Sequence, residues 1–171
     1  MTSLRTQRTL LRRARESDVD AFFAILSDAE TMRFWSTPPH RSVETTRSWL
    51  RPMLEPDPAI SDEFVIELEG EAVGKVGFYR LPELGFILRR DLWGRGIVFE
   101  AATAVIEHVL RTRNLDELVA DVDPRNVASL RLLARLGFEE SGRAERTYCI
   151  DGVWVDSVYM RRSIRRTPDG G

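Results

Sequence analysis

The sequence predicts a single domain of mixed α/β class, in which a mostly antiparallel central sheet is flanked by about four helices. Its 171 residues suit one domain that can bury a substantial core. Strand-like apolar runs alternate along the chain with apolar residues at helical spacing. Between residues 64 and 88, three strand-like runs follow one another with short connections, which is typical of an antiparallel meander.

The first third of the chain predicts one short strand and two helices. Residues 9–13 suit an edge strand. Ser17 is expected to cap a helix whose apolar residues at 19, 22, 23 and 26 share one face. Ser42 precedes a second apolar pattern, which we expect Pro52 to interrupt and the helix to end before Pro56.

The middle of the chain predicts the meander, with strands at residues 64–68, 72–79 and 84–88. Glu69-Gly70-Glu71 is expected to form the first tight turn. Gly74 and Gly77 are expected to weaken the second strand, since glycine offers no side chain to pack.

The last third predicts a helix–strand–helix–hairpin order. The segments are an amphipathic helix at 95–113, a buried strand at 118–122, a helix at 126–136, and strands at 138–150 and 153–160. Gly137 stands in the position of a left-handed helix cap, and Asp151-Gly152 is a strong hairpin signal. We therefore expect a domain over residues 1–164 and a flexible tail over 165–171.

Composition excludes several classes of function. The net charge of −2 provides no basic field for nucleic acid. Cys149 is the only cysteine, and His40 and His108 are too few and too far apart to suggest a metal site, so we expect no metal. No apolar run has membrane-spanning length and no signal segment is visible, so we expect a cytoplasmic protein with no membrane partner.

One turn carries the clearest chemical signal. Trp93-Gly94-Arg95-Gly96 follows a predicted strand and opens the helix at 95–113. The first amides of a helix lack intrahelical acceptors, and glycines allow an anion to approach the backbone closely. This arrangement suits a diphosphate. A plain strand-to-helix turn is the alternative, and the segment lacks the third glycine of a dinucleotide site and the Gly-Lys-Ser/Thr of a Walker loop.

This turn resembles the acetyl-CoA motif of the GNAT superfamily of N-acetyltransferases, written Gln/Arg-x-x-Gly-x-Gly/Ala. Gly94 and Gly96 match the motif, whereas Asp91 replaces its Gln/Arg, so backbone amides rather than side chains carry the resemblance. Residues 6–12 and 126–138 are similar to the opening strand and second cofactor helix of the branch that acetylates ribosomal-protein N-termini, the RimJ/RimL-like branch.

The resemblance implies the acyl-CoA N-acyltransferase fold, with acetyl-CoA as co-substrate and a sheet splayed at the cofactor site. It places the pantetheine arm on the backbone of Phe86, Ile87 and Leu88, with Asn126 reaching the arm or the acetyl group. The diphosphate would be held by the amides of the turn, with charge from arginines, and the adenosine phosphates by Arg131. The turn residues are Arg89, Gly94, Arg95, Gly96, Ile97 and Val98. Asn126 is also a suitable helix N-cap, a role compatible with cofactor binding.

The resemblance also implies two catalytic residues. Glu83 begins the strand before the turn, where relatives carry a glutamate that takes the proton of the amine, and a solvated acid at a strand end is the alternative. Ser129 matches a serine proposed to protonate the CoA thiolate, and an ordinary helical serine is the alternative. Many relatives carry a tyrosine where this chain has Leu133, which cannot donate a proton, and Tyr148 is a further donor.

The sequence therefore predicts an acetyl-CoA-dependent N-acetyltransferase that acts directly on a primary amine. A protein N-terminus fits best, because an α-amine of pKa ~7.7–8.0 is far easier to neutralise than a lysine of pKa ~10.4. A small-molecule amine or antibiotic is an alternative acceptor, and a catalytically degenerate CoA-binding regulatory module is an alternative of another class. Dimers are common in this branch, which leaves a homodimer possible.

Overall fold

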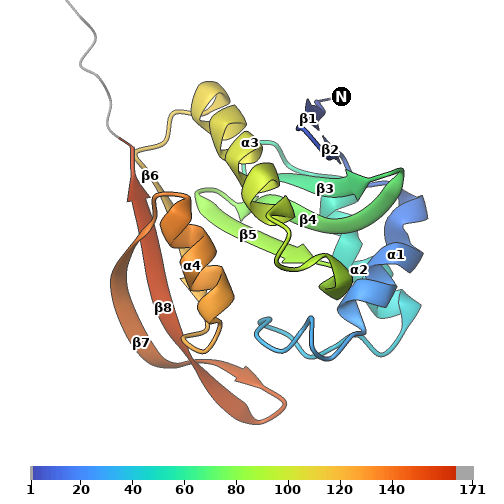
Figure 1. Ribbon diagram of the computed structural model, residues 1–171. Helices are drawn as coiled ribbons and strands as arrows, with labels where there is room; N and C mark the ends of the chain where they lie inside the picture. Colours follow the sequence, from blue (N-terminus) through green and yellow to red (C-terminus); the bar gives the residue numbers. More distant parts are fainter. Residues whose placement is uncertain (1, 165–171) are drawn as a thin grey trace, which may run out of the picture.

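The computed structural model describes residues 2–164, and its ribbon is drawn in Figure 1. Within this part, eight strands form one sheet in the order β1-β2-β3-β4-β5-β6-β8-β7. Neighbouring strands are antiparallel, except that β5 and β6 are parallel. The strands are β1 (Leu4–Arg5), β2 (Leu10–Arg12), β3 (Asp62–Leu68), β4 (Glu71–Arg80), β5 (Glu83–Leu88), β6 (Glu117–Val122), β7 (Glu139–Ile150) and β8 (Val153–Ser163). The predicted fold class is confirmed, whereas the predicted tail at 165–171 lies outside the described residues.

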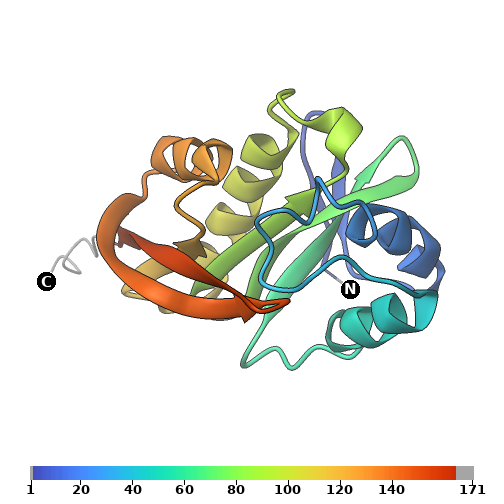
Figure 2. The ribbon, with the colours of Figure 1, turned by 90° about the horizontal axis from the view of Figure 1, so that it is seen from below.

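Helices cover both faces of the sheet. Figure 2 shows α3 and α4 on one face, and α1 and α2 on the other. The helices of the described part are α1 (Val19–Leu26), α2 (Val43–Leu54), α3 (Ile97–Thr112) and α4 (Val127–Arg135), with short 3₁₀ helices at Glu16–Asp18 and Arg90–Leu92. Each face therefore has its own helix pair.

The alternation of side chains along β3 divides the core between these two faces. Phe64 and Ile66 belong to the cluster that includes residues of α3, whereas Val65 packs with Phe22 of α1 and Leu50 of α2. All five side chains are fully buried. Successive strand residues point to opposite faces, so one strand supplies both cores.

The predicted turns and caps are present. The turns Glu69-Gly70 and Asp151-Gly152 have positive φ at both residues, 52° and 84° in the first and 48° and 81° in the second. Gly137 has φ 87° and ends α4, with the Phe138 amide donating to the Leu133 carbonyl at 3.0 Å. Local sequence signals therefore fix the connections as predicted.

Three predictions for the first third were wrong in detail. Ser17 does not cap α1, because it lies inside a 3₁₀ turn and the Asp18 carboxylate accepts from the Arg15 amide at 2.8 Å. Pro52 does not interrupt α2, which runs to Leu54. A proline so near the helix end removes one hydrogen bond, to the carbonyl of an exposed residue four positions earlier. The strand at Leu10–Arg12 is not the edge strand, since β1 pairs on its outer side.

Candidate active site

The sheet opens between β5 and β6. These strands share one register pair, Glu83 with Val119. Further along β5, residues 86–88 pair with β4, whose Gly74 lies opposite Leu88. The side of β5 that faces β6 therefore presents backbone groups not taken up by a neighbouring strand, in agreement with the predicted splay.

Close approach of β4 supports this part of β5. A Cβ added at Gly74 would lie 2.2 Å from the Ile87 carbonyl oxygen, so only glycine fits there. The Trp93 indole N–H donates to the Leu88 carbonyl at 2.9 Å, which attaches the turn after β5 to the end of the strand. The end of β5 is thus fixed by β4 on one side, and on the side facing β6 its Leu88 carbonyl is taken by Trp93 while Phe86 has no strand partner.

The glycine turn joins this open edge to α3. Gly94 has φ 72° and Gly96 has φ 74°, and Gly96 is the N-cap of α3. Gly94, Arg95 and Gly96 are exposed, and no atom lies within 4 Å of a Cβ added at Gly94. The first-turn amides of a 16-residue helix are therefore placed at an exposed, glycine-lined surface, which is suited to an anion.

Asp91, which replaces the Gln/Arg of the acetyl-CoA motif, forms an ion pair with Arg89. Asp91 accepts from Arg89 Nε at 2.7 Å and Nη2 at 3.1 Å, and Glu71 accepts from Arg89 Nη1 at 3.1 Å. The hydrogen bonds from Arg89 lower the pKa of Asp91. In this arrangement the charge of Arg89, a predicted cofactor residue, is directed to two carboxylates.

The start of α4 carries the second group of predicted residues. The Asn126 side chain accepts from the Ser129 amide at 3.2 Å, so the N-cap role is confirmed. Ser129 is half-buried and Arg131 is exposed. Leu133 is fully buried in the core, so its position contributes packing and no polar group.

A cavity of about 400 Å³ lies beside the other end of β5. Its lining comes from the loop at 34–37, from α2, from the ends of β3 to β6 and from the β7–β8 hairpin. Helices α3 and α4, both fully described, contribute no lining residue. The cavity is therefore separate from the glycine turn, and the region where β5 and β6 begin to part lies between them.

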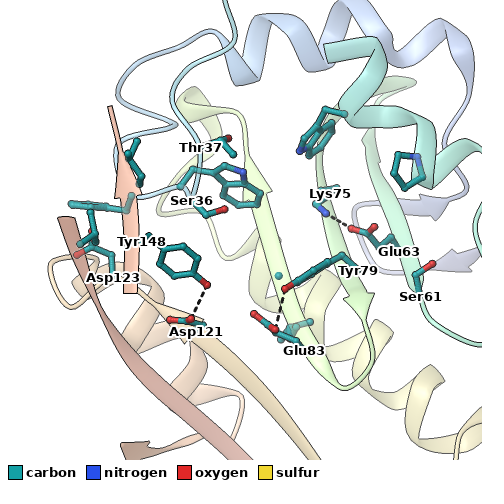
Figure 3. A pocket seen from close by; sticks show the side chains of 18 of the residues that line it. Ser36, Thr37, Ser61, Glu63, Lys75, Tyr79, Glu83, Asp121, Asp123 and Tyr148 are labelled. Atoms are coloured by element: carbon teal, nitrogen blue, oxygen red, sulfur yellow. Dashed lines mark hydrogen bonds and ion pairs between the residues drawn. The ribbon is translucent and has the colours of Figure 1, made fainter. Parts of the chain in front are cut away.

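Two tyrosine–carboxylate pairs form the polar end of the cavity (Figure 3). Tyr79 donates to Glu83 at 3.1 Å, and Tyr148 donates to Asp121 at 2.8 Å. Burial, followed by the adjacent Glu83, raises the pKa of Tyr79. Burial and the hydrogen bond to Asp121 raise the pKa of Tyr148. Both phenols therefore remain protonated donors at neutral pH, and the carboxylates act as acceptors.

A buried ion pair lies toward α2 in the same cavity. Lys75 pairs with Glu63, and both side chains are at least nine-tenths buried. The Lys75 Nζ also lies 5.3 Å from the ring centroid of Trp49. Because Glu63 neutralises the lysine and Asp123 pairs with Arg125 at 2.6 Å, the remaining carboxylates, Glu83, Asp121 and Asp156, give the cavity a negative character.

The structure brings some predicted residues together and separates others. Glu83 lines the cavity, but Ser129 and Asn126 do not. Sequence reasoning missed Asp121, which reads only as part of a buried strand, and gave Tyr148 no partner. No local sequence pattern indicates the Tyr148–Asp121 hydrogen bond, because these residues are 27 positions apart and meet only when β6, β7 and β8 assemble into the sheet.

Two further findings concern the described part of the chain. Within residues 2–164, no three His, Cys, Asp or Glu side chains are grouped so as to hold a metal ion. None of the helices in that part has the length and apolar character needed to cross a membrane.

Comparison with known proteins gives consistent results. The family described as acetyltransferase (GNAT) domain matches residues 8–139. The chain is 27% identical to an uncharacterized N-acetyltransferase p20 of Bacillus licheniformis over 175 residues, covering 97% of this chain and 98% of that protein. It is 40% identical to the [ribosomal protein uS5]-alanine N-acetyltransferase of Escherichia coli (strain K12) over 93 residues, which are 54% of this chain and 46% of that enzyme.

A solved structure shares the fold. The ribosomal L7/L12 alpha-N-protein acetyltransferase RimL, in complex with coenzyme A, superimposes with a TM-score of 0.84. The alignment covers 95% of this chain and 98% of that chain at 22% identity. The whole architecture is therefore of a known type.

Proposed function

The chain belongs to the GNAT family of N-acetyltransferases, and we propose that it transfers the acetyl group of acetyl-CoA directly to a primary amine bound in the cavity. The observation that carries the proposal is the exposed turn at Gly94 and Gly96, which opens α3 beside the unpaired edge of β5. A diphosphate at the turn and an extended arm along β5 would lead toward the cavity. Of the three residues predicted for that arm, Ile87 directs its carbonyl to β4 and the Leu88 carbonyl accepts from Trp93, so the backbone of Phe86 and the Leu88 N–H are the groups left for it.

Glu83 is the group best placed to accept a proton from the amine. In the proposed reaction, the amine nitrogen forms a bond to the thioester carbonyl carbon and the carbon–sulfur bond breaks. The bound ammonium first gives one proton to Glu83, directly or through water, and the second proton lost by the nitrogen on forming the amide passes to the thiolate through a donor such as Ser129. Tyr79 holds the Glu83 carboxylate in the cavity wall and leaves its second oxygen free of the phenol.

The charge of the cavity indicates the form in which the acceptor arrives. Five of its lining side chains are carboxylates and one is a lysine, so it favours a cation. An α-ammonium group loses its proton at pKa ~7.7–8.0, which a single carboxylate can assist. We propose a protein N-terminus as acceptor, and the likeness to the uS5-alanine N-acetyltransferase over 93 residues supports this choice.

Replacement of Gly94 by Asp tests the cofactor site. A side chain and a negative charge would enter the turn, so we expect CoA affinity, measured by calorimetry, to fall at least about tenfold, or ~1.4 kcal/mol. Gly152→Asp is the matched control, because Gly152 also has a positive φ, 81°, and nothing within 4 Å of an added Cβ. Unchanged CoA affinity in a folded Gly94→Asp variant would remove the diphosphate from the turn.

An acceptor screen tests the chemistry. Peptides with a free N-terminus, the same peptides blocked at the N-terminus but carrying lysine, and polyamines would be compared for acetyl-CoA turnover. We expect turnover with the free N-termini. Preference for polyamines or other small amines would favour the small-molecule alternative, and CoA binding with no turnover of any amine would favour the regulatory module.

A further inference from the structure

Arg8, which lies near the N-terminus, reaches the glycine turn in the middle of the chain. Its Nη1 donates to the Arg95 carbonyl oxygen at 2.8 Å, across 87 positions of sequence. Its Nε donates to Glu100 Oε2 at 2.7 Å, and its backbone amide donates to Glu100 Oε1 at 2.8 Å. Arg8 thus connects the β1–β2 segment to the turn and to the first turn of α3.

The carbonyl that Arg8 binds belongs to the peptide that leads into Gly96. In a planar trans peptide the carbonyl and the following N–H point in opposite directions. Because the Arg95 carbonyl points to Arg8, the Gly96 N–H points away from Arg8. Gly94 and Gly96 flank Arg95, and glycines permit rotations that other residues resist, so this orientation needs an external support.

Glu100 holds the arginine in place. Burial alone would raise the pKa of Glu100, but hydrogen bonds from Thr6 and Arg8 outweigh it and lower that pKa, so the carboxylate stays charged. Both carboxylate oxygens of Glu100 therefore accept hydrogen bonds from the segment before β2. A Cβ added at Gly96 would lie 3.6 Å from Arg8 Nη2, so the guanidinium also closes one side of the turn.

We propose that Arg8 and Glu100 are positioning residues for the cofactor diphosphate: they fix the Arg95–Gly96 peptide so that its N–H faces the phosphate. This inference rests on the proposed function. It assigns a role to the N-terminal segment, which shares no residue with the turn or with the cavity. The pair is partly exposed, with 41% of the Arg8 side chain accessible, so its loss should spare the fold.

The test compares Arg8→Gln with two donors of the acetyl group. Acetyl-CoA carries the diphosphate, whereas S-acetylpantetheine lacks it. We expect the KM for acetyl-CoA to rise about tenfold, equivalent to ~1.4 kcal/mol, with kcat and the acceptor KM unchanged. The kcat/KM for S-acetylpantetheine should stay within twofold of the unmodified chain. Arg143→Gln is the matched control, since Arg143 forms a similar exposed pair with Glu140 on β7.

Two further variants separate position from charge. Arg8→Lys keeps the charge but lacks the fork that spans Glu100 and Arg95, so it should behave like Arg8→Gln. Glu100→Gln should weaken acetyl-CoA binding less than Arg8→Gln does. The double variant should be no worse than Arg8→Gln alone, because Glu100 acts through Arg8. Calorimetry with CoA gives the same comparison without turnover.

Several outcomes would overturn the inference. Wild-type KM values in Arg8→Gln, full recovery in Arg8→Lys, or an equal loss with S-acetylpantetheine would each remove the positioning role. Thermal unfolding of each variant identifies a general loss of structure, in which case Glu100→Gln decides the result. Failure of the unmodified chain to bind CoA would overturn the proposed function as well, whereas normal CoA binding with an unaffected Arg8→Gln would overturn only this inference.

Discussion

Tyr79, Glu83, Asp121 and Tyr148 show how a few side chains set the chemistry of the cavity. Each phenol donates a hydrogen bond to one carboxylate, and both carboxylates lie at the same end of the cavity (Figure 3). Glu83 is singled out through the resemblance to the GNAT superfamily, because it begins the strand before the glycine turn, and the structure places it in the cavity wall. Asp121 could not be predicted, since its partner Tyr148 comes from a strand whose register shifts between Ala144 and Tyr148.

Glu83→Gln tests the proton transfer. The amide keeps the shape and the hydrogen bond from Tyr79 but cannot accept the proton, so we expect kcat to fall about 100-fold. The difference in kcat between Glu83→Gln and the unmodified chain should become smaller as pH rises above the amine pKa of ~7.7–8.0, because the acceptor then arrives neutral. A pH–rate profile measures this.

Tyr79→Phe provides the control for that experiment. It removes only the donor to Glu83 and leaves the carboxylate, so its pH–rate profile should keep the shape of the unmodified chain. A profile of Glu83→Gln that matches the unmodified chain in height and shape would exclude Glu83 from the reaction.

Strand β5 is the element on which both halves of the site depend. Its first residue lines the cavity, and its last residues lead into the glycine turn. Sequence patterns predicted this strand, the meander and the caps at Asn126 and Gly137, because these features depend on nearby residues. They failed at two residues. Ser17 does not cap α1 because it lies inside a 3₁₀ turn, and Pro52 does not interrupt α2 because the helix ends only two residues later.

Gly74→Ala tests the support of β5 by β4. The added methyl group would lie 2.2 Å from the Ile87 carbonyl oxygen, so one strand must move. We expect the free energy of unfolding to fall by about 2–3 kcal/mol, measured by chemical denaturation. Gly85→Ala is the control, because Gly85 lies in β5 with nothing within 4 Å of an added Cβ, and its change should stay within about 0.5 kcal/mol. Equal stability of the two variants would show that the strands do not need this close approach.

At the scale of the whole molecule, the two parts of the candidate site, the glycine turn and the cavity, lie apart and are both connected to β5. The glycine turn lies at the start of α3 on one face (Figure 2), whereas the cavity is built from α2, the 34–37 loop and the β7–β8 hairpin. The fold could be predicted from the order of elements and the motif at Gly94. The cavity could not, because its walls come from segments that are far apart in sequence and carry no shared pattern.

This arrangement predicts a ternary complex. In the proposed function, a cofactor at the glycine turn and an acceptor in the cavity would approach separately and meet where β5 and β6 part, so both would be bound when the acetyl group moves. Initial rates at several fixed acceptor concentrations should give intersecting double-reciprocal lines.

Cys149 is exposed and does not line the cavity, so Cys149→Ser should retain at least about half of the activity. Parallel lines, or an acetylated chain detected by mass spectrometry after incubation with acetyl-CoA alone, would instead require an acetyl-enzyme and a nucleophile from the chain. The proposed direct transfer is supported by this arrangement, in which the glycine turn and the cavity lie apart and the gap between β5 and β6 begins beside the cavity.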